Sequence, residues 1–339
     1  MSFSWNNVSK PIIALSPMAD MTDSPFCMTV KDVSSPVMFR EMVSSEALVR
    51  ENDKTLEMAA FDEIERPLIQ QIFGADPEAM AKAARIIWDT HKPDGIDINM
   101  GCPVYKLTSN FNGASLMRDS ELAHKIVVAV KAAVPCPVSV KIRAGWSDPN
   151  ECVEFAKMLE LAGADLITVH GRTKEQAYSG FADWHVIKLV KEAVSIPVLA
   201  NGDIFSGKDA QRCLKVTGAD GILVARGALG NPWMFQEIEE IVETGTVQSR
   251  PTYKQHFELV LAHAKRHVEQ YGDHGIVTFR KHLSWYTKGM TGAKEFRSQL
   301  VRIATIDELE DLVKPYLDDE REMDFVRLTS LQPNKYENE

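Results

Sequence analysis

Short apolar segments alternate with longer amphipathic segments along the first 243 residues of the chain. Eight apolar runs end in polar residues or glycine and are typical of strands: 12–18, 37–39, 68–72, 95–100, 138–143, 166–170, 198–201 and 221–224. Between them, apolar residues recur every three or four positions, which predicts helices over 77–90, 121–134, 150–162, 183–194 and 206–216. This alternation predicts an α/β fold, a parallel (β/α)8 or TIM barrel.

Two short patterns recur where a helix should turn back into a strand. Ala162-Gly163-Ala164-Asp165 is echoed by Thr217-Gly218-Ala219-Asp220, and Pro137 and Pro197 each lead into an apolar run. An open doubly wound sheet is the alternative architecture. No Gly-x-Gly-x-x-Gly follows the first strand, as a dinucleotide-binding sheet requires, so the barrel is favoured.

The strand pattern stops after Glu243. Residues 244–251 are polar and are predicted to form a linker, and helical periodicity resumes over 253–271, 276–288, 293–304 and 306–317. From residue 318 the chain is charged and loses its apolar period. We therefore expect a barrel domain (1–243), a small all-α domain (251–317) and a flexible charged tail (318–339).

Composition narrows the classes of function. Of 339 residues, 45% are hydrophobic and 25% charged, as in folded soluble proteins, and no apolar run reaches the ~18 residues of a membrane span. Five cysteines without a Cys-x-x-Cys pair argue against disulfides, iron–sulfur clusters and the usual zinc spacings, and the nine histidines contain no His-Glu-x-x-His. We expect a cytoplasmic protein with no metal, no membrane contact and no obligate protein partner. The net charge of −10 means that any nucleic acid must bind at a local patch.

Chemically capable side chains stand at the predicted carboxyl ends of the strands, where barrel enzymes place their active sites. Cys102 follows the 95–100 run; a lone cysteine is more often a small buried hydrophobe, but this position favours catalysis. Lys141 lies on an apolar run, so its ammonium needs an anion, either a carboxylate such as Asp97 or an anionic cofactor. His170, before Gly171, is either a core histidine or part of the site, and its position favours the site.

Glycines follow the last two predicted strands. Gly202, Gly227 and Gly230 allow a ligand to approach the backbone closely, and a helix start near Asn231-Pro232 offers N–H groups to an anion. This pattern predicts a phosphate site at the end of the barrel. The alternative is that the glycines only form tight turns.

Seven motifs follow one another along nearly the whole chain: Pro17-Met18-Ala19 with Thr22-Asp23 and Pro25-Phe26; Gln71-Ile72-Phe73-Gly74; Asp97-Ile98-Asn99-Met100-Gly101-Cys102-Pro103; Lys141-Ile142-Arg143; His170-Gly171-Arg172-Thr173; Asn201-Gly202-Asp203; and Arg280-Lys281-His282 with Trp285-Tyr286. In this order they resemble the tRNA-dihydrouridine synthase family, in its bacterial branch with a C-terminal helical domain. Three places depart from the family pattern: Asp20 where glycine is usual, Tyr105 where lysine is common, and Asn110-Phe111-Asn112 in place of a small, glycine-rich stretch.

The resemblance implies an FMN-dependent enzyme that uses NADPH to reduce particular uridines of tRNA to 5,6-dihydrouridine. It implies FMN contacts from Pro17, Met18, Ala19, Gln71, Lys141, His170, Asn201, Gly202, Asp203, Ala225 and Arg226. Cys102 is then the general acid: hydride adds at carbon 6 of uracil, and a thiol with a pKa near ~8.5 is still protonated at neutral pH and can protonate carbon 5. Contacts with the substrate are expected from Asn99, at the uracil edge, and from Arg172, Arg280, Lys281 and His282.

A local basic region is expected in the C-terminal helices. Between Lys254 and Arg302 nine Lys/Arg stand against four Asp/Glu, and five of the nine histidines fall there. Such a region can hold tRNA phosphates, although an ordinary solvated helical face gives the same count. The target base is expected to unstack into the barrel mouth, against Met18, Met100 or Tyr178.

Three other functions fit parts of the sequence. An FMN barrel acting on a free pyrimidine shares the strand-end residues but has no use for basic helices. A non-catalytic RNA-binding module leaves Cys102 and Lys141 unexplained. A non-flavin aldolase needs Lys141 as a neutral amine, and nothing near it in the sequence obviously lowers its pKa.

Overall fold

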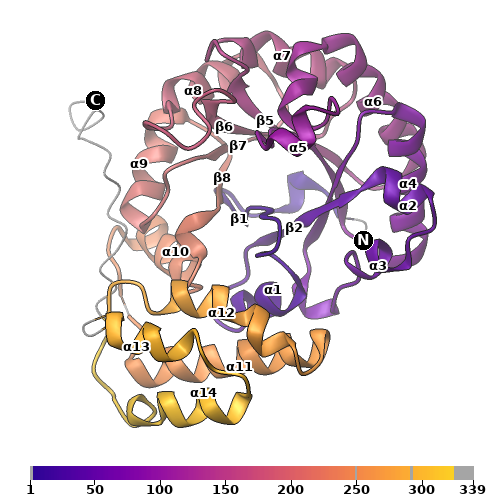
Figure 1. Ribbon diagram of the computed structural model, residues 1–339. Helices are drawn as coiled ribbons and strands as arrows, with labels where there is room; N and C mark the ends of the chain where they lie inside the picture. The colour runs from indigo at the N-terminus through magenta and orange to yellow at the C-terminus, as the bar shows by residue number, and fades with distance from the viewer. Residues whose placement is uncertain (1–2, 249, 291–292, 324–339) are drawn as a thin grey trace.

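The computed structural model describes residues 3–248, 250–290 and 293–323 and contains a closed parallel barrel (Figure 1). Its eight strands pair in sequence order, with β8 closing on β1. They are β1 (Ile12–Leu15), β2 (Val37–Ser44), β3 (Leu68–Phe73), β4 (Gly95–Met100), β5 (Val138–Gly145), β6 (Leu166–Thr173), β7 (Val198–Asn201) and β8 (Gly221–Val224). The predicted TIM barrel is confirmed, and every predicted strand start coincides with an observed one.

The strand ends differ from the prediction at the carboxyl end of the barrel. β2 and β6 continue beyond their apolar runs through polar residues that are mostly buried, such as Arg40 and Arg172, and β5 continues by two small residues, Ala144 and Gly145. β1 stops three residues early, and Pro17 and Met18 line a cavity instead. The apolar run therefore predicts where each strand begins. It does not predict where the strand ends, because β2 and β6 continue through polar residues and β1 ends before Pro17.

Helices surround the barrel in the order that the periodicity predicts. They are α1 (Ser24–Lys31), α2 (Ser45–Val49), α3 (Asp53–Glu57), α4 (Pro77–His91), α5 (Tyr105–Thr108), α6 (Ser120–Ala133), α7 (Glu151–Leu161), α8 (Trp184–Ala193), α9 (Gly207–Thr217) and α10 (Met234–Thr244). Side-chain caps fix several starts: Asp76 accepts from the N–H of Ala79 at 2.7 Å, and Ser206 from that of Asp209 at 3.1 Å. Gly218 ends α9 in the left-handed region, with φ at 61°.

The barrel interior changes from apolar to polar along its axis. Trp5, Phe39, Ile69 and Leu199 belong to an apolar cluster that is separate from the shell between strands and helices. Alternate residues of a strand share a face, so Lys141 and Arg143 of β5 point the same way. The polar interior positions therefore collect at the carboxyl ends of the strands.

The helices after Pro251 have a core of their own beside the barrel (Figure 1). They are α11 (Tyr253–Tyr271), α12 (Gly275–Tyr286), α13 (Ala293–Leu300) and α14 (Ile306–Val313), followed by a 3-10 turn at Lys314–Tyr316. A capping box of Thr252 and Gln255 starts α11, which packs against α1 of the barrel.

The predicted tail at 318–339 is wrong for its first residues. Met323 is buried in the helical core and its N–H donates to the carbonyl of Pro251 at 2.8 Å, while Glu322 bridges to Thr252. The charged composition does not reveal that this segment packs against the start of α11, because backbone hydrogen bonds hold it there and these do not depend on side-chain type. Residues 324–339 lie outside the described part of the chain.

In the part of the chain that the structure describes, no helix combines the length and the apolar character that crossing a membrane demands.

Candidate active site

A cavity of about 350 Å³ lies at the carboxyl ends of the barrel strands. All eleven residues predicted to contact FMN line it, together with Cys102 and Asn99. Their side chains come from β3 to β7 and from the loops after β1, β4, β7 and β8. Strand register explains the proximity, because Asn99 pairs with Lys141 and His170 with Asn201 on neighbouring strands.

Cys102 is a free, partly exposed thiol in the turn after β4. The side-chain oxygen of Asn99 shapes this turn by accepting from the N–H groups of Gly101 at 3.1 Å and Cys102 at 2.9 Å. The other cysteines are buried, which raises the pKa of Cys136 to about 11 and that of Cys152 to about 12. Of the five cysteines, Cys102 is the one whose residue lines the cavity, and its role as general acid stays a prediction.

A chain of hydrogen bonds below the cavity fixes Asn99. Its amide nitrogen donates to Gln71 at 2.9 Å, and Gln71 donates to Asp97 at 2.6 Å, which also accepts from Ser139 at 2.6 Å. Burial raises the pKa of Asp97 to about 6, against the lowering by Ser139 and Gln71. Asn99 is thus engaged in positioning Cys102, and its contact with the uracil edge stays a prediction.

Lys141 carries the positive charge at the centre of the cavity wall. Its ammonium donates to the side-chain oxygen of Asn201 at 3.3 Å, and in the described chain it forms no ion pair with Asp97. Burial, followed by repulsion from Arg143, lowers the pKa of Lys141 to about 8, so the group is still mostly charged at neutral pH. The expectation that nothing nearby lowers this pKa is wrong, because Arg143 lies two residues away on the same face.

His170 faces the same cavity as a neutral side chain. Burial and then the charges of Arg143 and Lys141 hold its pKa well below the usual range. Gly202 permits this packing: its φ is 119°, and a Cβ there would lie 2.8 Å from the His170 ring. His170 can therefore offer a hydrogen bond to a ligand without changing charge near neutral pH.

Arg172 does not line the cavity. Its buried guanidinium makes two 2.8 Å hydrogen bonds to the carboxylate of Asp203 and one to the carbonyl of Gly180. This ion pair holds the β6 and β7 loops together, and the contact of Arg172 with a substrate stays a prediction. Arg226 is more exposed, 3.6 Å from Asp203, with its guanidinium against the rings of Tyr178 and Phe205.

The sequence interpretation missed Arg143 as a residue of the site. It lines the cavity, donates to the carbonyls of Gly101, Thr173 and Ala177, and lies against the ring of Tyr178. Its two-residue spacing from Lys141 was the available signal. Of the three residues expected to stack on a base, Met18 and Tyr178 line the cavity, whereas Met100 is fully buried away from it.

The three substrate residues predicted on α12 have other roles. Arg280 donates to the carbonyl of Ile303 at 2.9 Å, and Lys281 donates to the carbonyl of Asp20. His282 is buried, and burial lowers its pKa to about 3. None of the three lines the cavity. The buried His282 cannot reach a substrate on the surface, and substrate contact by Arg280 and Lys281 stays a prediction.

The basic region of the helices is weaker than the sequence count suggests. Lys254 pairs with Glu320, Lys265 with Glu310 and Arg266 with Asp32, all acids outside the counted window. His256, His263 and His267 are buried like His282. Of the nine cations counted between residues 254 and 302, the exposed ones without an ion pair to a described residue are Lys288, Lys294 and Arg302.

Two departures from the family pattern have a backbone explanation. Asp20 has φ of 60° and Phe111 has φ of 59°, in the left-handed region that glycine adopts most easily. Asp20 suits this region better than most side chains, whereas Phe111 carries a bulky one. Tyr105, the third departure, is 82% exposed at the start of α5.

The fold and this cavity define a (β/α)8-barrel protein with an enzyme-like site at the carboxyl ends of its strands. A family model described as "Dihydrouridine synthase (Dus)" matches residues 13–321. The chain belongs to the dihydrouridine synthase family.

Individual relatives agree with this assignment. The chain is 41% identical over 301 residues to the "Probable tRNA-dihydrouridine synthase 1" of Synechocystis sp., covering 88% of this chain and 84% of that protein. It is 38% identical over 312 residues to the "tRNA-dihydrouridine synthase B" of Proteus vulgaris, covering 91% and 96%. A solved structure described as "Crystal structure of TcOYE with pHBA" is 10% identical with a TM-score of 0.49, over 77% of this chain and 94% of that one.

Proposed function

We propose that this protein is an FMN-dependent tRNA-dihydrouridine synthase that takes its electrons from NADPH. The observation that carries the proposal is the meeting of the Cys102 thiol and the Lys141 ammonium in one cavity of the barrel. A proton donor and a buried cation are the two groups that reduction of a uracil ring beside an anionic cofactor requires.

The cavity residues fit FMN. Among the residues that the structure describes, the only hydrogen-bond partner of Lys141 is a neutral amide, Asn201, so an anionic ring beside it would gain a charge-assisted bond. Arg226 and the backbone of Gly202 and Ala225 lie at the β7 and β8 ends, where barrels commonly bind phosphate. Gln71 and His170 would contact the ring system from β3 and β6.

Cys102 would complete the reduction. When bound, reduced FMN supplies the hydride that adds to carbon 6 of uracil. The Cys102 thiol then donates its proton to carbon 5, so the substrate gains one hydride and one proton and the cysteine is left as a thiolate that solvent reprotonates. Asn99 aids this step by fixing the turn that carries the thiol.

The helical region would hold the tRNA against the barrel mouth. Lys288, Lys294 and Arg302 are exposed, and α12 is joined to the cavity rim by the bond from Lys281 to Asp20. Cations in this position bind phosphates without reading bases. Tyr178, exposed at the cavity, can stack on the flipped uracil.

The test is conversion of a defined RNA. Purified protein reconstituted with FMN is incubated with NADPH and an unmodified tRNA transcript, and dihydrouridine is located by mass spectrometry of nuclease fragments. The expected result is dihydrouridine at one or a few positions. Turnover of free uracil without any reaction of tRNA would instead support the free-pyrimidine alternative.

A further inference from the structure

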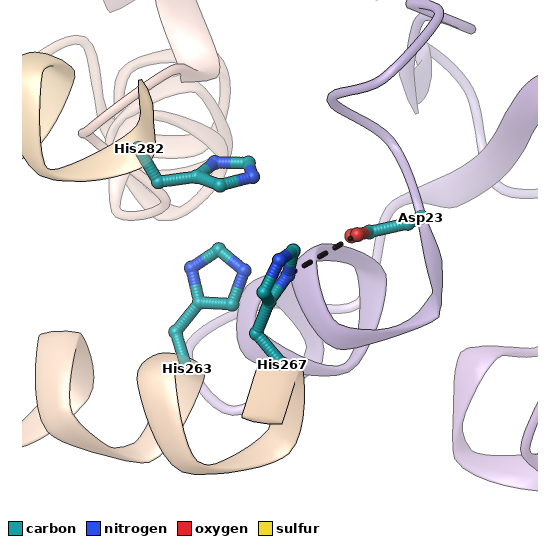
Figure 2. Close-up of side chains that lie close together, drawn as sticks. All are labelled: Asp23, His263, His267 and His282. Atoms are coloured by element: carbon teal, nitrogen blue, oxygen red, sulfur yellow. Dashed lines mark ion pairs between the residues drawn. The ribbon is translucent and has the colours of Figure 1, made fainter. Parts of the chain in front are cut away.

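A second group of chemically capable side chains lies away from the cavity, between the barrel and the helical region. His263 and His267 from α11, His282 from α12 and Asp23 at the start of α1 converge there (Figure 2). One potential ligand atom from each lies within 4.8 Å of the other three. We call these four residues the His3Asp cluster; none of them lines the cavity, and all are buried.

The outer ring nitrogens of two histidines are already occupied. The Nδ1 of His263 lies 2.9 Å from the hydroxyl of Tyr286, and the Nε2 of His267 lies 2.9 Å from the hydroxyl of Thr278. The nitrogens that remain are Nε2 of His263, Nδ1 of His267 and Nε2 of His282, and these are buried without a hydrogen bond among the described residues. Partners on the outer nitrogen commonly orient metal-binding histidines.

His267 faces Asp23 across the cluster. Its Nδ1 lies 3.4 Å from a carboxylate oxygen of Asp23. Its Nε2 lies 2.9 Å from the hydroxyl of Thr278, which also lies 2.9 Å from the carbonyl of Gly275. When the single hydroxyl proton of Thr278 is donated to Gly275, the hydroxyl accepts from the Nε2–H of His267 and the Nδ1 lone pair is directed at the cluster. This tautomer is the one that a metal-binding histidine adopts.

Asp23 is itself held in place. One carboxylate oxygen accepts from the N–H of Phe26 at 3.1 Å as the cap of α1, and the other accepts from the hydroxyl of Tyr271 at 3.0 Å. The carboxylate is fixed by the barrel on one side and the helical region on the other. Such fixed orientation is what a closed metal site requires of its ligands.

We propose that the His3Asp cluster binds one Zn²⁺ ion that fastens the helical region to the barrel. Three imidazole nitrogens and one carboxylate oxygen form a four-coordinate set suited to zinc. Zinc–ligand bonds are ~2.0–2.1 Å, so ligand atoms that lie up to 4.8 Å apart need to move inward by at most roughly 0.9 Å each. The proposal replaces the sequence expectation of no metal, which rested on local motifs, whereas Asp23 and His282 come together from opposite ends of the chain.

The test is the metal content of the full-length protein, purified without an affinity tag that binds metal. Zinc is measured by mass spectrometry after dialysis, in the wild type, in His263→Gln and His282→Gln, and in His256→Gln as the matched control. His256 is also a buried histidine of α11 but bonds to the carbonyl of Tyr286 outside the cluster. We expect about one equivalent in the wild type and in His256→Gln and less than about a tenth in the two cluster variants.

A second measurement uses the wild type alone, in case the cluster variants do not fold. Cobalt-substituted protein should show the visible absorption of four-coordinate Co²⁺, and X-ray absorption of the zinc form should show only nitrogen and oxygen ligands at ~2.0 Å. Wild-type protein that neither contains zinc nor takes it up, zinc retained by His282→Gln, or sulfur ligation would overturn the proposal. Metal content is independent of catalysis, so this outcome is separable from the proposed enzymatic function.

Discussion

The charge of Lys141 is expected to set the affinity of the cavity for an anion. Its pKa is lowered to about 8, so the ammonium is present below that pH and is lost as the pH rises through it. We expect the dissociation constant for FMN to rise by at most about tenfold per pH unit above about pH 8, and to level off at the value of a protein without this charge. Fluorescence quenching of FMN across this range measures it.

Lys141→Met supplies the matched comparison for that pH dependence. Loss of a charge-assisted hydrogen bond should weaken FMN binding by about tenfold to a hundredfold and remove the pH slope. Lys188→Met, on the outside of the barrel, should bind as the wild type does. A Lys141→Met protein that keeps the slope would show that another group holds the anion.

Asp20 illustrates how backbone conformation selects a residue. The backbone is in the left-handed region there, with its N–H bonded to Glu41 at 2.8 Å and its carbonyl to Lys281. Asp20→Gly should leave the free energy of unfolding nearly unchanged, whereas Asp20→Val should lower it by about 1–2 kcal/mol although the position is exposed. Urea denaturation measures both, and equal stability of the two variants would contradict the account.

At the scale of elements, Asn99 joins β3 and β4 to the turn that carries Cys102. Asn99→Ala removes the acceptor for the Gly101 and Cys102 N–H groups and leaves Gln71 without its donor. We expect a kcat lowered by about tenfold or more, because leaving buried groups unpaired costs about 1–3 kcal/mol and the thiol loses its orientation.

Asn99→Asp separates the two roles of that side chain. Asn99→Asp keeps an oxygen that accepts from the N–H groups of the turn, but it loses the hydrogen bond to Gln71. We therefore expect Cys102 to be alkylated at the wild-type rate in Asn99→Asp and at a different rate in Asn99→Ala. Iodoacetamide labelling without tRNA measures this rate. Identical labelling rates in the wild type and in both variants would contradict a role of Asn99 in positioning Cys102.

The elements also show what the sequence can and cannot predict. Periodicity predicted each strand start and the long helices. A helix that buries one face, or a strand that is buried on both, leaves its pattern of apolar residues within a short stretch of sequence. The strand-end rule then placed Lys141, His170 and Asn201 in one cavity. The sequence could not show that Arg172 forms an ion pair with Asp203, or that His282 packs near Asp23. These contacts join residues that are far apart in the chain.

At the scale of the whole molecule, an acidic chain has to bind an acidic substrate. We expect tRNA affinity to fall steeply with salt concentration, and Lys288→Ala or Lys294→Ala to reduce the logarithmic salt slope by about one each. Lys265→Ala is the control within the same region, because Lys265 is paired with Glu310 at 2.7 Å. Filter binding over a series of salt concentrations measures the slopes, and an unchanged slope in both exposed variants would place the tRNA elsewhere.

The most direct test of the central claim is an anaerobic single turnover of the reconstituted protein with tRNA. The flavin is reduced with NADPH, unmodified tRNA is added, and flavin reoxidation is followed beside dihydrouridine content in wild type and Cys102→Ala. The account predicts rapid reoxidation with matching dihydrouridine in the wild type. In Cys102→Ala the reaction should be slowed by about a hundredfold or more, as loss of a general acid typically does. Equal rates in the two proteins, or a flavin that tRNA leaves reduced, would contradict it.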